Sequence, residues 1–337
     1  MKYFYLSNIV TVVGLFLAYE WAGLPGLGIA ALLMVMEITL SFDNAVVNAS
    51  VLKTMTEVWQ KRFLTWGILI AVFGMRLVFP IAIVSLATGM GMVEVWNLAL
   101  SDQETYSSHV LASHVQIAAF GGMFLLMVFL KFVLDETKDL HWIGFVERKL
   151  AALGKLESVE VVLALSILLT MVSFLPEQDQ MDGLFAGVIG VVLYVLVKSI
   201  TALCGGSEES AHGATRTVAY SGFMGFMYLQ LLDASFSLDG VIGAFAMSKD
   251  IIIIMLGLGA GAMFVRSMTI YLVKKGTLAE YVYLEHGAHY GIGALAIIML
   301  VSMQVHVPEA ITGLIGLSFI LLSLWSSVRH KKLLPRA

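Results

Sequence analysis

Ten apolar segments, each close to the length that crosses a bilayer, dominate this chain of 337 residues. A membrane-spanning helix needs about 20 predominantly apolar residues. The segments therefore predict an all-α fold, a polytopic transmembrane helix bundle of about ten spans. They lie near residues 5–22, 27–52, 63–90, 114–134, 158–176, 183–203, 219–247, 251–273, 288–304 and 309–328.

Composition agrees with a protein whose main partner is the lipid bilayer. The chain is 59% hydrophobic and 13% charged, against about 45–50% and 25% in soluble domains. The single cysteine, Cys204, excludes an intramolecular disulfide and a cysteine-cluster metal site. The first apolar run ends without a small-x-small cleavage site, so we expect an uncleaved span. The small net charge of −4 says nothing about nucleic acid, but the sequence has no basic domain and no aromatic RNA-binding signature, so we expect no nucleic-acid partner.

Basic residues orient the predicted spans. With the N-terminus placed in the cytoplasm, 17 of the 20 lysines and arginines fall in inner loops or at inner span ends. The other three are Lys249, on the outer side, and Arg76 and Arg266, which lie inside spans. By the positive-inside rule, this bias predicts a multi-pass plasma-membrane protein of the bacterial inner-membrane type with both termini cytoplasmic.

Two carboxylates interrupt the second span, in the run from Glu37 to Asn44. Ionised groups at bilayer depth are costly, so they usually face a bundle interior and mark an ion or proton pathway. On a helix, Glu37, Ser41, Asn44 and Asn48 share one face, while Asp43 lies well round from it. Glu37 and Asp43 could therefore bind one ion only if the helix is broken or the ion lies between helices.

A second run, from Asp233 to Gly240 in the seventh span, repeats the pattern of the first. Ser237 and Asp239 stand where the first run has Ser41 and Asp43. Because the two spans are an odd number apart, they cross the membrane in opposite directions. Arg76 and Arg266 follow similarly spaced small residues in the next spans. These matches predict two inverted-topology repeats, an arrangement typical of secondary transporters.

The repeat divides the chain into two predicted transmembrane halves. The first comprises residues 1–203 with the motif span 27–52, and the second comprises 219–337 with the motif span 219–247. Residues 204–218, rich in glycine and serine, form a predicted cytoplasmic linker. Span 183–203 is assignable to either half.

Four carboxylates and two guanidiniums would then share the interior, with a balance of two negative charges. A divalent cation would neutralise them, and oxygen ligands suit manganese, magnesium or calcium. Arginine pairing that only fixes helix packing and protonated acids that carry protons are the other interpretations. The predicted metal ligands are Glu37, Asp43, Asn44, Asp233 and Asp239, supported by Ser41, Asn48, Ser237, Arg76 and Arg266.

Glu285 to His289, at the inner end of the ninth span, is a further candidate metal or proton site, or a water-facing helix end. No nucleophile elbow, phosphate loop or His-Glu-x-x-His motif is present, so we expect neither enzyme activity nor a bound cofactor.

The two motifs also resemble a known family. Glu37-x-x-Leu40-Ser41-x-Asp43-Asn44 with Asp233-x-x-Phe236-Ser237-Leu238-Asp239 is similar to the paired signature of TerC-like integral membrane proteins, in the LysE/TerC transporter superfamily. The likeness covers roughly residues 27–134 and 219–304. It implies manganese export or homeostasis, with the motif acids as ion ligands. This chain differs in its extra length between the halves and in Gly240, where the first motif has Asn44.

We therefore expect a transporter of a divalent cation, manganese by preference, with protons as candidate coupling ions. One alternative is a non-transporting scaffold in a stress or tellurite-resistance complex, acting through the inner loops 135–157 and 204–217. Another is an exporter of a small organic solute, in which Arg76 and Arg266 would bind a substrate carboxylate.

Overall fold

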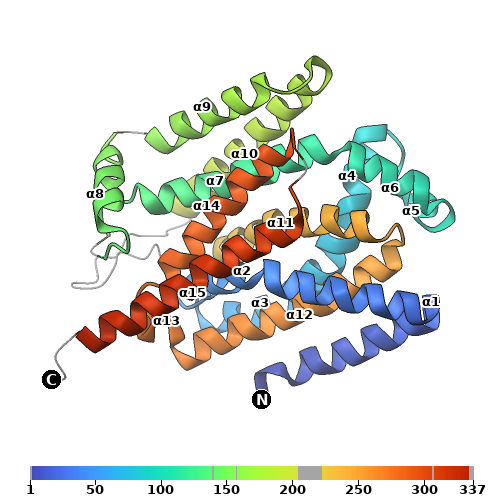
Figure 1. Ribbon diagram of the computed structural model, residues 1–337, viewed down its shortest axis with the longest axis horizontal. Helices are drawn as coiled ribbons and strands as arrows, with labels where there is room; N and C mark the ends of the chain where they lie inside the picture. Colours follow the sequence, from blue (N-terminus) through green and yellow to red (C-terminus); the bar gives the residue numbers. More distant parts are fainter. Residues whose placement is uncertain (1, 139, 157, 204–221, 306, 334–337) are drawn as a thin grey trace.

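The computed structural model describes the whole chain except residues 1, 139, 157, 204–221, 306 and 334–337 (Figure 1). The side chain of Asp239 also lies outside the described part, as does the predicted linker 204–218. About 87% of the described residues are helical, and these residues contain no strand. The helices are η1 (Lys2–Phe4), α1 (Tyr5–Leu40), α2 (Phe42–Leu52), α3 (Glu57–Leu69), η2 (Ile70–Val78), α4 (Phe79–Thr88), α5 (Met92–Ser101), α6 (Gln103–Ala112), α7 (His114–Val133), α8 (Gly144–Leu153), α9 (Val159–Ser173), α10 (Glu177–Leu203), α11 (Gly222–Met247), α12 (Ile251–Lys275), α13 (Thr277–Glu280), α14 (Leu284–Ser302) and α15 (Glu309–Leu333).

The all-helical, multi-pass prediction is confirmed. Seven helices in the described residues are long and apolar enough to cross a membrane, or up to eight if the bent pair Glu57–Gly67 and Ile70–Leu86 forms one span. The helix α9, in the predicted span 158–176, has only 15 residues, fewer than the roughly 20 that a perpendicular crossing takes.

The long helix α1 consists of two legs. Its backbone leaves helical geometry at Ala22 and Gly23, where Gly23 has a φ of 64° that favours glycine. Before this kink, Phe4 contacts Phe264 and Gly14 approaches Leu256 of α12. After it, Gly26 approaches Ile253 and Glu37 approaches Gly261. The two legs of α1 therefore run along α12 in opposite directions, as Figure 1 shows for the blue part of the chain.

The motif segment itself is broken. The helix α1 ends at Leu40, Ser41 has φ and ψ of −102° and 18°, and α2 begins at Phe42. Neither glycine nor proline occurs at the break. The C-terminal end of α1 and the N-terminal end of α2 therefore meet between Glu37 and Asp43, the two acids of the first motif.

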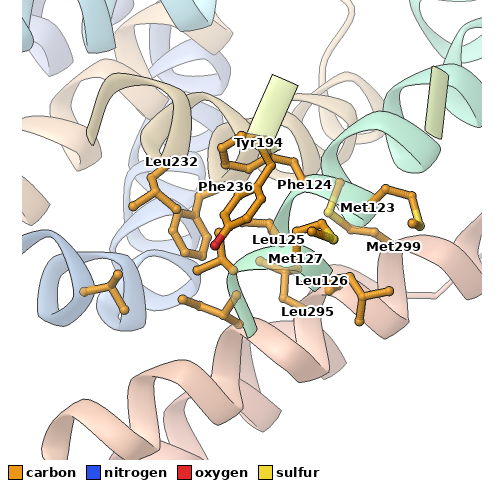
Figure 2. Close-up of a cluster of buried hydrophobic side chains, with 14 of the residues drawn as sticks. Met123, Phe124, Leu125, Leu126, Met127, Tyr194, Leu232, Phe236, Leu295 and Met299 are labelled. Carbon is orange, nitrogen blue, oxygen red and sulfur yellow. The ribbon is translucent and has the colours of Figure 1, made fainter. Parts of the chain in front are cut away.

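A central hydrophobic core surrounds α2. The helix α7 contributes many buried residues to this core and packs against α10, α11 and α14. Figure 2 shows Phe124 and its neighbours from α7 beside Tyr194 of α10, Phe236 of α11 and Leu295 of α14. This apolar packing holds α11, which carries the second motif, and α14 against α2, and it positions the polar residues described next.

Candidate functional site

Glu37 and Arg76 form a buried ion pair. The Arg76 Nη2 donates a hydrogen bond to Glu37 Oε1, and both side chains are almost inaccessible to solvent. Ser41 Oγ donates to the same carboxylate oxygen at 3.2 Å. Arg76 lies in the π-helix η2 and donates from Nη1 to the carbonyl of Ala71, five residues earlier. The first motif acid is thus neutralised by the next span.

Asp233 and Arg266 repeat this arrangement in the second half. Arg266 Nη2 donates to Asp233 Oδ2 at 3.1 Å. The guanidinium also donates to the carbonyl of Phe63 at 2.9 Å and lies over the Phe63 ring, 3.9 Å from its centroid. These contacts compensate the desolvation that burial of an ion pair costs. The first acid of each motif is therefore paired with the arginine of the following span.

The two motifs also contact each other. Asn44 Nδ2 donates to Asp233 Oδ1 at 2.9 Å. In the reverse direction, Gly240 of the second motif approaches Glu37 of the first. A Cβ atom on this glycine would lie 3.3 Å from Glu37 Oε2. The eighth residue of each motif thus faces the first acid of the other. The predicted meeting of the two acidic runs is present in the structure.

Asp43 has a different environment from these paired acids. Its side chain is buried, with the residue 4% exposed, and it makes no ion pair with any described residue. Oδ1 accepts a hydrogen bond of 2.9 Å from the backbone N–H of Asn44. Asp43 also lies in the first turn of α2, where the positive end of the helix dipole stabilises an anion.

A small cavity of about 10 Å³ adjoins the Asp43 carboxylate. A space of this size holds about one water molecule. Cβ atoms added to Gly291 and Gly316 would lie 3.1 and 3.5 Å from Asp43 Oδ2, so these glycines leave the room. The cavity is lined by Leu40, Asp43, Phe236, Gly240, Gly291, Leu295, Thr312 and Gly316.

The predicted ligands do not converge on one point in the described residues. No group of three or more His, Cys, Asp or Glu side chains in the described part could hold a metal ion together. Asp239, the fourth predicted acid, falls outside this description because its side chain is not described. Ser237 and Asn48 are buried, and each has a side-chain oxygen without a hydrogen-bond partner among the described residues.

Three features of the site were not predicted from the sequence. Gln230 is buried one turn before Asp233. A polar amide residue within an apolar run is the sequence feature that could have indicated it. Gly291 and Thr312 line the Asp43 cavity from α14 and α15. No sequence signal links these two helices to Asp43.

A second polar cluster lies at the start of α14. Glu147 of α8 is 0% exposed and accepts hydrogen bonds on Oε1 from Tyr290 and from two backbone N–H groups, those of Trp142 and Ile143. Its other oxygen faces Lys138 and His286, at 3.8 and 3.7 Å. Burial is the main cause that lowers the pKa of Lys138, and nearby Glu147 opposes it.

Of the predicted run Glu285 to His289, this cluster contains His286. His289 stacks on Phe132, with ring centroids 3.8 Å apart. Glu285 faces Lys53 at 3.8 Å. The run therefore anchors the α7–α9 connection and the end of α2 to α14.

No curated protein and no solved structure matches this sequence. A family model does match, over residues 42–334. The match includes Asp43, Arg76 and the whole second motif. The chain accordingly belongs to the DUF475 family, whose members are described as proteins of unknown function.

Proposed function

We propose that this protein is a membrane transporter for a divalent metal cation, with manganese as the preferred ion and export or homeostasis as its role. The proposal places it in the bacterial inner membrane, with ten spans and both termini cytoplasmic. Calcium and magnesium are the other candidate ions, and protons are the candidate coupling ion. The motif resemblance to TerC-like proteins supports manganese, and the geometry around Asp43 supports a cation.

The observation that carries the proposal is the contrast between Asp43 and the other two described motif acids. Glu37 and Asp233 each have a guanidinium partner. Asp43 instead faces a cavity that has room for about one water molecule or one dehydrated ion. A carboxylate at membrane depth needs a compensating charge or a proton. A cation bound in the cavity would supply that charge, and Thr312 could add an oxygen ligand.

Paired contacts support two inverted repeats around this site. Residues 37 and 44 of the first motif correspond to 233 and 240 of the second. The contact of Asn44 with Asp233 then corresponds to that of Gly240 with Glu37, with the halves exchanged. Both first acids bind the arginine of the next span. One chain is expected to reproduce such a set of contacts if its halves are related by a pseudo-two-fold axis in the membrane plane.

The acids then divide into two roles. Glu37 and Asp233 hold Arg76 and Arg266 and fix the packing of each half. Asp43 and Asp239, the equivalent seventh residues of the two motifs, bind the ion, and two carboxylates neutralise a divalent charge. Ser41, Ser237, Asn44 and Asn48 complete the polar surroundings with oxygen atoms suited to hard cations.

The arginine pairs weigh against an exporter of organic acids, because a substrate carboxylate would have to displace Glu37 or Asp233. A scaffold function would leave the buried, uncompensated Asp43 without a role.

The test is manganese transport by the purified protein in liposomes that contain a manganese-sensitive dye. Asp43→Asn and Asp239→Asn are compared with the parent protein and with Glu94→Gln, a change of an exposed acid on α5. We expect uptake by the parent and by Glu94→Gln, and loss of uptake in both motif variants. Equal rates in all four proteins would refute the proposed function.

A further inference from the structure

We infer that Asn44, Asn48 and Gln230 form a hydrated access site that receives the cation on the Lys53 side of Asp43, while the equivalent residues on the opposite side form an apolar barrier. This inference rests on the proposed function and extends it. We call these three residues the amide cluster.

Buried amide atoms without partners point to this site. Asn44 Oδ1, Asn48 Oδ1 and both polar atoms of the Gln230 side chain have no hydrogen-bond partner among the described residues. Asn48 is 2% exposed and Gln230 is 4% exposed. Buried polar groups in folded proteins are nearly always satisfied by protein or by ordered water. Water or a hydrated ion is therefore the partner that fits these amides.

The orientation of the Asn44 amide is fixed by its neighbour. A carboxylate only accepts hydrogen bonds, so the group facing Asp233 must be the Asn44 NH₂. The amide oxygen of Asn44 then remains for another donor or a cation. Asn48 lies one turn further along α2 on the same face, four residues on. Two amide oxygens thus line this face of α2.

Gln230 lies on the same side of the site, one turn before Asp233 on α11. The backbone of Gly67 permits its approach, because a Cβ atom there would lie 2.8 Å from Gln230 Nε2 and 2.6 Å from Arg266 Nη1. Arg266 is already neutralised by Asp233. The guanidinium therefore does not prevent a cation from entering among the amides.

The equivalent positions on the opposite side carry no amide. In the alignment of the two motifs, Asn44, Asn48 and Gln230 correspond to Gly240, Ala244 and Met34. Ala244 is fully buried in an apolar cluster with Phe245 and Leu258. The repeats thus match in their ion pairs and differ in polarity on the two sides of Asp43.

Chain direction identifies the polar side. From Asn44, α2 runs through Asn48 to Lys53, and α11 runs from Gly222 through Gln230 to Asp233. Lys53 belongs to the basic residues that mark the predicted cytoplasmic side. Amide and carboxylate oxygens bind hard cations either directly or through their waters. A hydrated divalent cation would therefore reach Asp43 from the cytoplasm, the direction that export requires.

The test compares thiol accessibility at matched positions. Cys204→Ala removes the only native thiol, and single cysteines then replace Asn48, Gln230, Ala244 or Met34. A membrane-impermeant maleimide is applied to inside-out vesicles. We expect labelling at positions 48 and 230 to be several-fold faster than at 244 and 34. Equal rates, or faster labelling at 244 and 34, would overturn the inference.

A variant without cysteine provides a second readout. Asn48→Leu replaces an unpartnered amide with an apolar side chain of similar size. If the amide cluster is hydrated, this change lowers cation transport and does not raise the Tm. A raised Tm with normal transport would show that the position is dry and would also overturn the inference.

Failure of the inference differs from failure of the proposed function. Labelling reports access to water and needs no transport. Manganese transport with symmetric labelling would remove only the inference. Asymmetric labelling without transport of any divalent cation would instead refute the proposed function and leave the hydrated access site.

Discussion

Asn44 of the first motif donates a hydrogen bond of 2.9 Å to Asp233 of the second, across 189 positions of sequence. The same Asp233 also accepts from Arg266. Asn44 therefore links one half of the protein to the ion pair of the other, and its contribution can be measured directly.

Asn44→Ala should lower the free energy of unfolding by about 1.5–3 kcal/mol, because it removes a hydrogen bond to a charged group and leaves a buried oxygen of Asp233 without it. Thermal unfolding in detergent would measure the loss. Asn97→Ala changes an exposed asparagine on α5 and should alter the Tm little. An equal effect of the two substitutions would contradict the coupling of the halves through Asn44.

Removal of Arg76 should be more damaging than removal of the whole ion pair. Arg76→Met leaves Glu37 buried without its counter-charge, and loss of one partner of a buried pair costs about 3–5 kcal/mol. The double variant Glu37→Gln with Arg76→Met should recover much of that loss. Folded yield and the Tm of the three proteins would measure both effects.

An exposed ion pair provides the control for Arg76. Lys331→Met breaks the pair with Glu280, in which both side chains are exposed, and such pairs contribute about 0–1 kcal/mol. A double variant at positions 37 and 76 that is no more stable than Arg76→Met alone would contradict the compensation argument.

Asp43→Asn should abolish cation binding and leave the Tm unchanged or raised. The substitution removes a buried charge that has no cationic partner among the described residues. The folded protein is thereby relieved of the desolvation free energy of that charge and loses no ion pair. Addition of manganese should raise the Tm of the parent protein and not that of the variant, since only a state that binds the ion is stabilised by it. A large drop in Tm for Asp43→Asn without manganese would indicate a structural role instead.

The glycines around Asp43 allow a steric test with a matched control. A Cβ atom at Gly291 would lie 3.1 Å from Asp43 Oδ2, and one at Gly316 would lie 3.5 Å away, an ordinary contact. Gly291→Ala should therefore reduce transport more than Gly316→Ala does. Initial transport rates at equal protein amounts would compare them. The reverse order would argue against the cavity as the ion site.

Lys138 should make stability depend on alkaline pH. Burial lowers its pKa below the ordinary 10.5, so between its folded pKa and 10.5 the unfolded chain binds more protons than the folded protein. Stability from this group must then rise with pH through that window. The Tm of the parent protein, measured over this range, should rise relative to that of Lys138→Arg, which keeps its charge. Parallel curves would exclude the effect.

The helices and the paired acids could be predicted because both have local signals. Long apolar runs marked the helical segments, and Arg76 and Arg266 stood out as charges inside such runs. Their pairing with Glu37 and Asp233 follows from the high cost of unpaired charges at that depth.

Other parts of the site had no such signal. The break at Ser41 occurs without glycine or proline, the residues whose local effects most often interrupt a helix, so no local pattern predicts it. The cavity beside Asp43 depends on Gly291 and Gly316, which lie more than 240 positions away in sequence and carry no side chain whose pattern could indicate their position. Gln230 was visible as a polar residue, but its significance depends on the unpartnered state of its amide in the folded protein.

The π-helix that carries Arg76 gives the first half of the protein additional backbone in that span. A π-helical segment contains more residues per turn than the α-helices on either side. It therefore holds more residues than an α-helix with the same number of turns. If the segment tightened by one residue, its two ends would rotate relative to each other by about 100°. In α12, where Arg266 lies, the helix is regular from Ile251 to Lys275, so the additional backbone of the π-helix belongs to the first half alone.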